Sequence, residues 1–291
     1  MSGRTYDVVV AGSVNADLVV RVDRRPGAGE TVLGSDLATH PGGKGANQSV
    51  AAARLGGRVA FLGRVGTDGH GDLVREALGG DGVDIGHLIT TPGPTGVALI
   101  TVDPEGDNSI IVSPGANARV TEQDIAAARP LFAAASVVSL QMEIPPAAVL
   151  AAARTAAEEG ARVVLNLSPA AAVPDELLAL CDPLVVNEHE AEFLGDTRPA
   201  GLLARGVRSV VITRGADGAV VADASGITEV PSPQVEVVDT TGAGDAFTGA
   251  LCLRLAHGDD LAAAARLATR VGAAAVRKAG AQSSFPALSD L

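Results

Sequence analysis

The sequence predicts an α/β protein with a mostly parallel central sheet. Apolar runs of strand length alternate with Ala- and Leu-rich helical stretches over most of the 291 residues. The runs are apolar almost throughout, which is typical of strands that helices cover on both faces. No repeat, low-complexity tract or long linker divides the chain, so we expect one principal domain over residues 1–291.

The strand and helix patterns follow one another in a regular order. Six Val- and Ile-rich runs are expected to form buried strands: YDVVVAG (6–12), RVAFLGRVG (58–66), SVVSLQ (136–141), ARVVLNLS (161–168), PLVVN (183–187) and SVVITRG (209–215). Helices are expected at Ala46–Leu55, Gly71–Leu78, Thr121–Ala135, Pro146–Glu159 and Asp175–Leu180, and at about 243–257 and 260–277.

Two segments, 17–34 and 95–113, interrupt this alternation. Each has the pattern strand, polar turn, strand, with Pro, Gly, Asp and Asn at the turn. No helical pattern follows either of them, as a βαβ unit would require. We expect a small separate sheet over the mouth of the main domain, a lid that excludes water.

Composition excludes several classes of function. The formal net charge is −12, from 22 basic and 34 acidic residues, which argues against nucleic acid and anionic membrane as partners. Six aromatic residues are too few for a base-stacking platform, so a bound adenine would lie between aliphatic side chains. Cys181 and Cys252 form no CxxC motif, and the N-terminus does not resemble a signal peptide. A cytoplasmic protein is expected.

The stretch VVDTTGAGDAF (237–247) places Asp239 and Asp245 around bare backbone just before a helix. Gly242 and Gly244 suit a tight turn, and Asp245 suits the first turn of a helix, so a structural role is one interpretation. The other is an anion site, because small residues let several N–H groups converge at a helix N-terminus. Asp245 would then lie near the group that receives a phosphate.

Three further motifs admit both a structural and a functional interpretation. PGGKGANQ (41–48) is either a glycine-rich helix entry or a site where Lys44 and Asn47 supply donors. GSVNAD (12–17) is either a turn or a sugar site, because Asn15 donates and accepts while Asp17 accepts from two hydroxyls. NEHE (187–190) is either a helix start or a place where Glu190 organises Mg²⁺. Walker A and HExxH patterns are absent. A strict GxGxxG pattern is absent as well, which removes the main support for a nicotinamide dehydrogenase.

Ligands of open α/β sheets bind beyond the carboxyl ends of the strands. The polar residues directly after the expected strands are therefore the first candidates for a site. They are Asn15, Asp17, Glu143, Asn187, Glu190 and the segment Thr213 to Gly215.

The order of these motifs resembles the PfkB carbohydrate kinase family, in particular its ribokinase branch. GSVNAD, GGKGAN, QMEIP, NEHE, TRGADG, DTTGAGDAF and RKAGAQSS occur in that family's order from about Val8 to Pro286. The resemblance implies a ribokinase-like three-layer α/β/α fold with a β-sheet lid, and a homodimer that pairs lids. It also implies ATP-dependent phosphorylation of the primary hydroxyl of D-ribose.

The resemblance assigns roles to individual residues. It implies that Asp245 is the catalytic base and that Gly242, Ala243 and Gly244 form an anion hole; a carboxylate at a helix N-terminus is expected to stay ionised at neutral pH. The implied sugar ligands are Asn15, Asp17, Gly43, Lys44, Asn47, Glu143 and Asp245. ATP is expected, with Mg²⁺, near Asn187, Glu190, Thr213, Gly215, Ala216, Asp217, Gly218, Gly244 and Thr269. A monovalent cation, usually K⁺, is implied at Asp239, Thr241, Ala275, Lys278, Gly280 and Ser284.

Two departures from the family pattern concern the nucleotide side. Thr269 stands where relatives often have Asn or His near adenine, and the stretch from Leu194 to Arg208 is shorter than usual. Other PfkB kinases, acting on deoxyribose, fructose, a keto-deoxy sugar acid or a nucleoside such as adenosine, remain alternatives. A sugar- or nucleotide-binding regulator without catalysis is a further one, although it would not need a base at Asp245.

Overall fold

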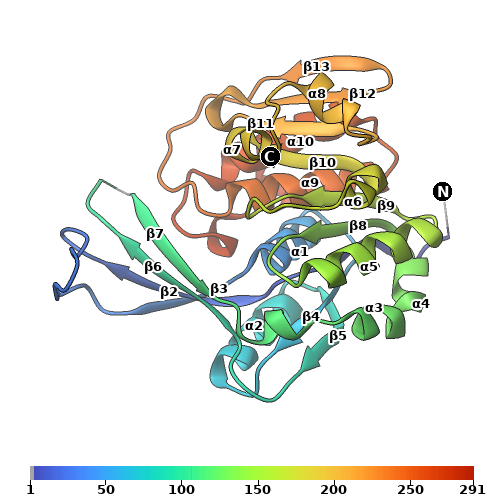
Figure 1. Ribbon diagram of the computed structural model, residues 1–291. Helices are drawn as coiled ribbons and strands as arrows, with labels where there is room; N and C mark the ends of the chain where they lie inside the picture. The colour runs from blue at the N-terminus through green and yellow to red at the C-terminus, as the bar shows by residue number, and fades with distance from the viewer. Residues whose placement is uncertain (1–2, 106) are drawn as a thin grey trace.

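The computed structural model of the protein describes residues 3–105 and 107–291. Its main sheet has nine strands in the order β13-β12-β11-β10-β9-β8-β1-β4-β5 (Figure 1). Seven strands run parallel, and β12 and β13 form an antiparallel edge. Their bounds are β1 Tyr6–Ala11, β4 Val59–Val65, β5 Asp84–Thr90, β8 Ala135–Gln141, β9 Arg162–Asn166, β10 Cys181–Asn187, β11 Val210–Thr213, β12 Ala219–Asp223 and β13 Gly226–Val230.

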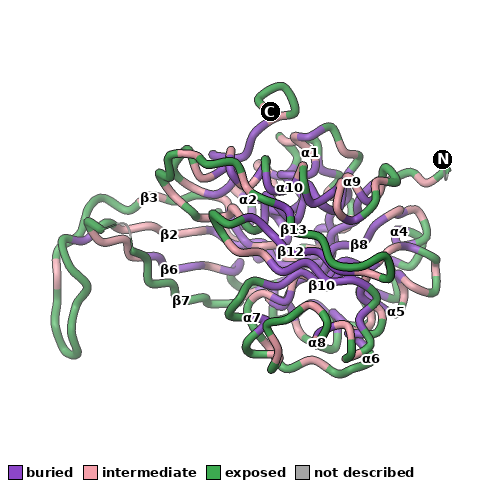
Figure 2. Tube along the Cα trace, turned by 90° about the horizontal axis from the view of Figure 1, so that it is seen from above, coloured by how far each residue is buried: buried purple, intermediate pink, exposed green. Residues whose placement is uncertain are grey.

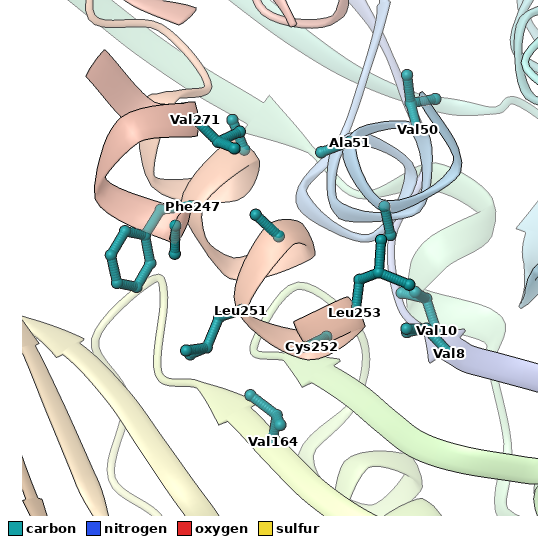
Figure 3. Packing of buried hydrophobic residues seen from close by; sticks show 14 of the residues in the cluster. Val8, Val10, Val50, Ala51, Val164, Phe247, Leu251, Cys252, Leu253 and Val271 are labelled. Carbon is teal, nitrogen blue, oxygen red and sulfur yellow. The ribbon is translucent and has the colours of Figure 1, made fainter. Parts of the chain in front are cut away.

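Helices cover both faces of this sheet, as the apolar runs predicted. Val8 and Val10 of β1 belong to one core with α1, α2, α9 and α10, and Figure 3 shows part of that core. Val9 and Ala11 belong to the opposite core, under α3 to α8. The helices are α1 Lys44–Arg54, α2 Gly69–Gly80, α3 Glu122–Ala127, α4 Arg129–Ala133, α5 Pro146–Glu158, α6 Asp175–Leu180, α7 Glu188–Phe193, α8 Pro199–Ala204, α9 Ala243–Ala256 and α10 Leu261–Ala275.

Two expectations about these elements were wrong in detail. The single helix over 121–135 is split into α3 and α4, because Pro130 lies at the start of α4 and has no N–H to continue a helix. Strands β5, β12 and β13 were not foreseen. Charged and glycine residues weaken the buried-strand pattern in β5 and β13, and the apolar run of β12 is only four residues long. The short helix α8 lies within the stretch from Leu194 to Arg208.

A separate four-stranded sheet, here called the small sheet, has the order β3-β2-β6-β7. It extends from one side of the main body (Figures 1 and 2). The hairpin expected over 95–113 is confirmed as β6 Gly96–Val102 and β7 Asn108–Ser113. The one expected over 17–34 is misplaced: β2 is Asn15–Arg21, and its partner β3 is Ala38–Gly42. In the segment that connects β2 to β3, an isolated bridge joins Val22 and Gly34. The strand β3 lies further along the chain than expected and pairs with β2 in the register that sets Gly42 opposite Asn15.

The strand order reverses between β1 and β8. The chain passes from β1 outward through β4 and β5, and then returns to place β8 on the other side of β1. Such a switch point leaves a crevice at the carboxyl ends of the two strands, where ligands of open α/β sheets bind. Asn15 follows β1 and Glu143 follows β8, so both lie at this crevice. None of the described helices is both long and apolar enough to cross a membrane.

Candidate active site

The small sheet leads directly into α1 through Gly43, whose φ of 90° is in the region that favours glycine. A Cβ atom on Gly43 would lie 2.7 Å from both Val14 Cα and Asn15 N. The backbone of the β1–β2 connection is therefore packed against the entry to α1 without room for a side chain. This close approach brings the GSVNAD and GGKGAN motifs, which are about thirty residues apart, into one site.

The polar side chains of this first half of the site are held by hydrogen bonds. Asn117 Nδ2 donates to Asn15 Oδ1 at 2.8 Å, and Asn117 is itself held because Val14 N donates to its Oδ1. Glu143 Oε2 accepts from Ser13 Oγ at 2.5 Å and from Lys44 N at 3.1 Å. We did not identify Ser13 or Asn117 from the sequence; Ser13 lies inside a quoted motif, but nothing near Asn117 marks it.

Asp245 lies in the first turn of α9 and is only 7% exposed. Asn47 Nδ2 donates to its Oδ2 at 2.9 Å, and Gln48 Nε2 donates to its Oδ1 at 3.2 Å. Gln282 Nε2 in turn donates to Asn47 Oδ1 at 3.0 Å. Both oxygens of the Asp245 carboxyl group are thus held by α1, and its position depends on residues far away in the sequence.

The charges of four carboxyl groups, those of Asp17, Glu143, Glu190 and Asp245, act on one ammonium group at this site. Burial, together with repulsion from Glu143 and Asp245, raises the pKa of Asp17 to about 7. Burial alone would lower the pKa of Lys44, but attraction to Asp245, Glu143 and other carboxylates outweighs it and raises the pKa. Lys44 is therefore positively charged near neutral pH and compensates part of the negative charge.

Burial acts on the ionisation of Asp245 in addition to its place at a helix N-terminus. Burial is the largest effect and raises the pKa of Asp245, although Lys44 and the hydrogen bonds from Asn47 and Gln48 oppose the rise. Water is excluded from this carboxyl group, and its charged form loses solvation. A raised pKa makes Asp245 a stronger proton acceptor when it is ionised.

The N-terminus of α9 has no side-chain cap. Gly242 precedes it with a φ of 75°, and among the described residues no acceptor is found for the amide N–H groups of Gly244 and Asp245. A Cβ atom on Gly244 would meet nothing within 4 Å. Free amides at a helix N-terminus beside open space can bind an anion.

A cavity of about 290 Å³ adjoins this N-terminus. Six residues of the expected ATP set line it: Thr213, Gly215, Ala216, Gly218, Gly244 and Thr269. The other three, Asn187, Glu190 and Asp217, do not. Its walls from α9, α10 and the segment before them are mainly apolar, with Val235, Val237, Phe247, Ala273 and Val276. We did not identify these apolar residues, because periodicity does not separate a ligand wall from a core.

The NEHE motif (187–190) begins helix α7 in the structure, which agrees with its interpretation as a helix start. Asn187 Oδ1 accepts from Glu190 N, and Glu190 Oε2 accepts from Asn187 N, both at 2.8 Å, which is a capping box. Glu190 also faces the site, since its charge helps raise the pKa of Lys44. The capping role therefore leaves the charge of Glu190 near enough to act on Lys44.

Asp239 joins the loop before α9 to the loop after α10. Its Oδ1 accepts from Thr241 N at 2.9 Å and from Thr241 Oγ1 at 2.6 Å, and its Oδ2 accepts from Gly280 N at 2.8 Å. Burial would raise the pKa of Asp239, but these hydrogen bonds outweigh it and hold the pKa below its ordinary value. In the described chain no donor is found for the carbonyl oxygens of Lys278 and Gly280. A carboxylate beside free carbonyls suits a cation.

Comparisons with known proteins agree with this geometry. The model of the pfkB family of carbohydrate kinases matches residues 5–288. A ribokinase of Bacillus subtilis is 39% identical over 282 residues, 96% of each chain, and one of Staphylococcus aureus is 36% identical over 300 residues, 99% of each. The structure of Arabidopsis thaliana ribokinase complexed with ribose and ATP has a TM-score of 0.89 at 33% identity and covers 98% of this chain and 97% of its own. The chain therefore belongs to the pfkB family of carbohydrate kinases.

Proposed function

We propose that this protein transfers the γ-phosphoryl group of ATP to O5 of D-ribose, giving ribose 5-phosphate and ADP. The ribokinases among its relatives and the likeness to a ribokinase complexed with ribose and ATP support this substrate pair. The observation that carries the proposal is the place of Asp245. It lies at the uncapped N-terminus of α9, directly after Gly244, which lines the apolar cavity, and its charge helps raise the pKa of Asp17.

In the proposed step, Asp245 accepts the proton of the sugar hydroxyl. The hydroxyl oxygen forms a bond to the γ-phosphorus while the bond from that phosphorus to the bridging oxygen of ADP breaks. Charge that spreads over the phosphoryl oxygens would be stabilised by the anion hole of Gly242, Ala243 and Gly244 and by Lys44. The Gly244 amide has no acceptor in the described chain, whereas the Ala243 amide donates to Thr240 O at 3.2 Å and would have to leave that bond. The enzyme contributes mainly alignment and fixed charge, which such a transfer requires.

The sugar would bind under the small sheet. Asn15, Asp17, Gly43, Lys44, Asn47 and Glu143 offer both donors and acceptors at one place, as a polyol requires. We propose that the small sheet acts as a lid, within a single kinase domain, and excludes water from the transferring group.

Two cations belong to the proposal. The donor set fits Mg²⁺ bound mainly by ATP phosphates and water, because this ion usually takes only one or two carboxylates from a protein. Glu190 would organise its waters, and Mg²⁺ would neutralise phosphate charge. K⁺ would bind Asp239 with oxygens of Thr241, Ala275, Lys278, Gly280 and Ser284. It would hold together the two loops that Asp239 already joins.

Two further properties are proposed. Leu99 of β6 and Ile110, Ile111 and Val112 of β7 are exposed large apolar side chains, which supports a homodimer through the small sheets. Cys181 and Cys252 are both free and buried, which supports a reducing compartment.

The experiment that tests this function measures ADP release with ATP, Mg²⁺ and K⁺ across ribose, deoxyribose, fructose and adenosine. We expect ribose to give the highest kcat/KM. A preference for another acceptor would keep Asp245 as the proton acceptor but reassign the sugar pocket. Tight binding of ATP and ribose without ADP release would instead support a regulator without catalysis.

A further inference from the structure

Gln48 follows Asn47 on α1, and its side chain is fully buried between Asp245 and the sheet. Its Nε2 donates to Asp245 Oδ1 at 3.2 Å and to Asn166 Oδ1 at 3.3 Å. Its Oε1 accepts from Ser139 Oγ at 2.8 Å and from Gln141 Nε2 at 2.6 Å. An amide has two donor hydrogens and two acceptor lone pairs, so every hydrogen-bonding position of Gln48 is used.

Two of these partners, the carboxylate of Asp245 and the NH₂ group of Gln141, fix which way the Gln48 amide faces. If the group turned by 180°, its oxygen would face the Asp245 carboxylate, and its nitrogen would face the donating nitrogen of Gln141. Both contacts would be repulsive in a buried site where water cannot screen them. Gln141 on β8 therefore holds the NH₂ group of Gln48 toward Asp245, and the Ser139 hydroxyl supports this orientation by donating to Gln48 Oε1.

Gln48 and Asn47 hold Asp245 from different sides. Asn47 reaches Asp245 Oδ2 and belongs to the proposed sugar pocket, whereas Gln48 reaches Oδ1 and is surrounded by residues of β8 and β9. Since Gln48 is 0% exposed, it is shielded from the space that a sugar would occupy. It can act on the reaction only through Asp245.

We propose that Gln48 is a positioning residue for the catalytic base, oriented by Ser139 and Gln141. It holds one oxygen of Asp245 and stabilises the ionised carboxylate, so that the remaining lone pairs face the hydroxyl of the acceptor. This inference rests on the proposed function only in assigning Asp245 as the proton acceptor.

The charged groups around Asp245 determine how the loss of Gln48 would be seen. Burial raises the pKa of Asp245, Lys44 lowers it, the hydrogen bond from Asn47 lowers it, Glu143 raises it, and the hydrogen bond from Gln48 lowers it. The charge of Asp245 in turn helps raise the pKa of Asp17. Removing the Gln48 donor takes away one of the few effects that favour the ionised form.

The test uses Gln48→Met, which keeps the length of the side chain and removes its donors and acceptors. The unaltered protein is first assayed with ribose, ATP, Mg²⁺ and K⁺. In the variant we expect kcat at neutral pH to fall by about 10- to 100-fold, the usual effect of losing a hydrogen bond to a charged group. The acid limb of the profile of kcat against pH should move to higher pH, and the ribose KM should change by less than about twofold.

Ser49→Ala is the matched control on α1. Ser49 is also fully buried, but its hydroxyl only donates to Gly45 O within the helix and does not contact Asp245. We expect it to leave the pH profile unchanged. If Gln48→Met does not fold, Ser139→Ala removes one of the two groups that orient Gln48 and should move the acid limb in the same direction by a smaller amount.

An unchanged acid limb in a folded Gln48→Met variant, with kcat reduced or not, would overturn the inference. A second readout does not depend on the acceptor sugar. The infrared band of a protonated buried carboxyl group, assigned by its loss in Asp245→Asn, should appear at higher pH in Gln48→Met than in the unaltered protein. Inactivity of the unaltered protein on ribose would count against the proposed function, whereas the band would still decide the role of Gln48.

Discussion

The carboxyl group of Asp17 on β2 occupies the space that a Cβ atom on Gly42 of β3 would need. Gly42 does not have a positive φ, so its lack of a side chain is required by this contact and not by its backbone conformation. The two glycines that begin the GGKGAN motif are thus required for two different reasons. Gly42 makes room for Asp17, and Gly43 allows the turn into α1.

Gly42→Ala should therefore weaken sugar binding by displacing Asp17. We expect the ribose KM to rise about tenfold or more, the effect of losing a charge-assisted hydrogen bond, with a smaller change in kcat. Steady-state kinetics check this. Gly69→Ala is the control, because a Cβ atom there would meet nothing within 4 Å. Equal ribose KM values for the two variants would contradict the assignment of Asp17 to the sugar.

Asp17 should also make the stability of the sugar-free protein depend on pH. Its pKa rises from an ordinary 3.8 to about 7 on folding, so the folded state binds more protons than the unfolded state between these values. The free energy of unfolding should fall as pH rises through this window and level off above it. Urea unfolding of Asp17→Asn should show a stability gain over the unaltered protein that grows from pH 5 to pH 7. A gain independent of pH would refute the shift.

Asp245→Asn should abolish turnover and leave sugar binding largely intact. Removing a general base commonly lowers kcat by about 10²- to 10⁴-fold. The NH₂ group of the new Asn faces a donor, either Asn47 Nδ2 or Gln48 Nε2, so we expect the melting temperature to fall, although removing a buried charge offsets part of this loss. Calorimetric titration with ribose and single-turnover rates measure the two effects. A kcat close to that of the unaltered protein would remove Asp245 as the base.

Asp239→Asn should lower activity and raise the K⁺ concentration needed for half-maximal rate. In Asn, an NH₂ group replaces one carboxylate oxygen and faces a donor that this oxygen accepted from. Each lost hydrogen bond to a charged group destabilises the loop by about 1.5 kcal/mol or more. We expect about a tenfold loss of kcat at limiting K⁺. Rates are measured over a K⁺ series, with Na⁺ as the replacement ion.

Asp223→Asn is the matched control for this variant. Asp223 Oδ1 accepts from Ser225 N and Ser225 Oγ, the same local pattern that Asp239 makes with Thr241, but at the β12–β13 turn. It should leave the K⁺ dependence unchanged. A rate that does not depend on K⁺ in the unaltered protein would reject the cation site.

Ile111→Lys should convert the proposed dimer into a monomer. Ile111 on β7 is 69% exposed, at the edge of the small sheet, and a charge there opposes burial of this face. Light scattering with size exclusion measures the mass. Ile227→Lys is the control, because Ile227 is 59% exposed on β13, at the edge of the main sheet. A monomer in the unaltered protein at all concentrations would exclude the dimer.

The sequence by itself determined the parallel sheet, its two helix layers and the family. Buried parallel strands must be apolar on both faces, so their runs are visible without any knowledge of contacts. The motifs around Asn15, Lys44 and Asp245 could likewise be found, because each combines glycine with polar residues over a few positions. Such local patterns do not depend on how the chain folds.

Only the tertiary structure decided how the groups of the site act on one another. Gln48 contacts Asp245 across 197 positions of sequence, Asn117 contacts Asn15 across 102, and Gln282 contacts Asn47 across 235. The position of β3 depended on its register with β2, and the pKa of Asp245 depended on its burial and on groups from distant parts of the chain. Desolvation and hydrogen bonds between distant segments arise only when the chain is assembled, so no local pattern records them.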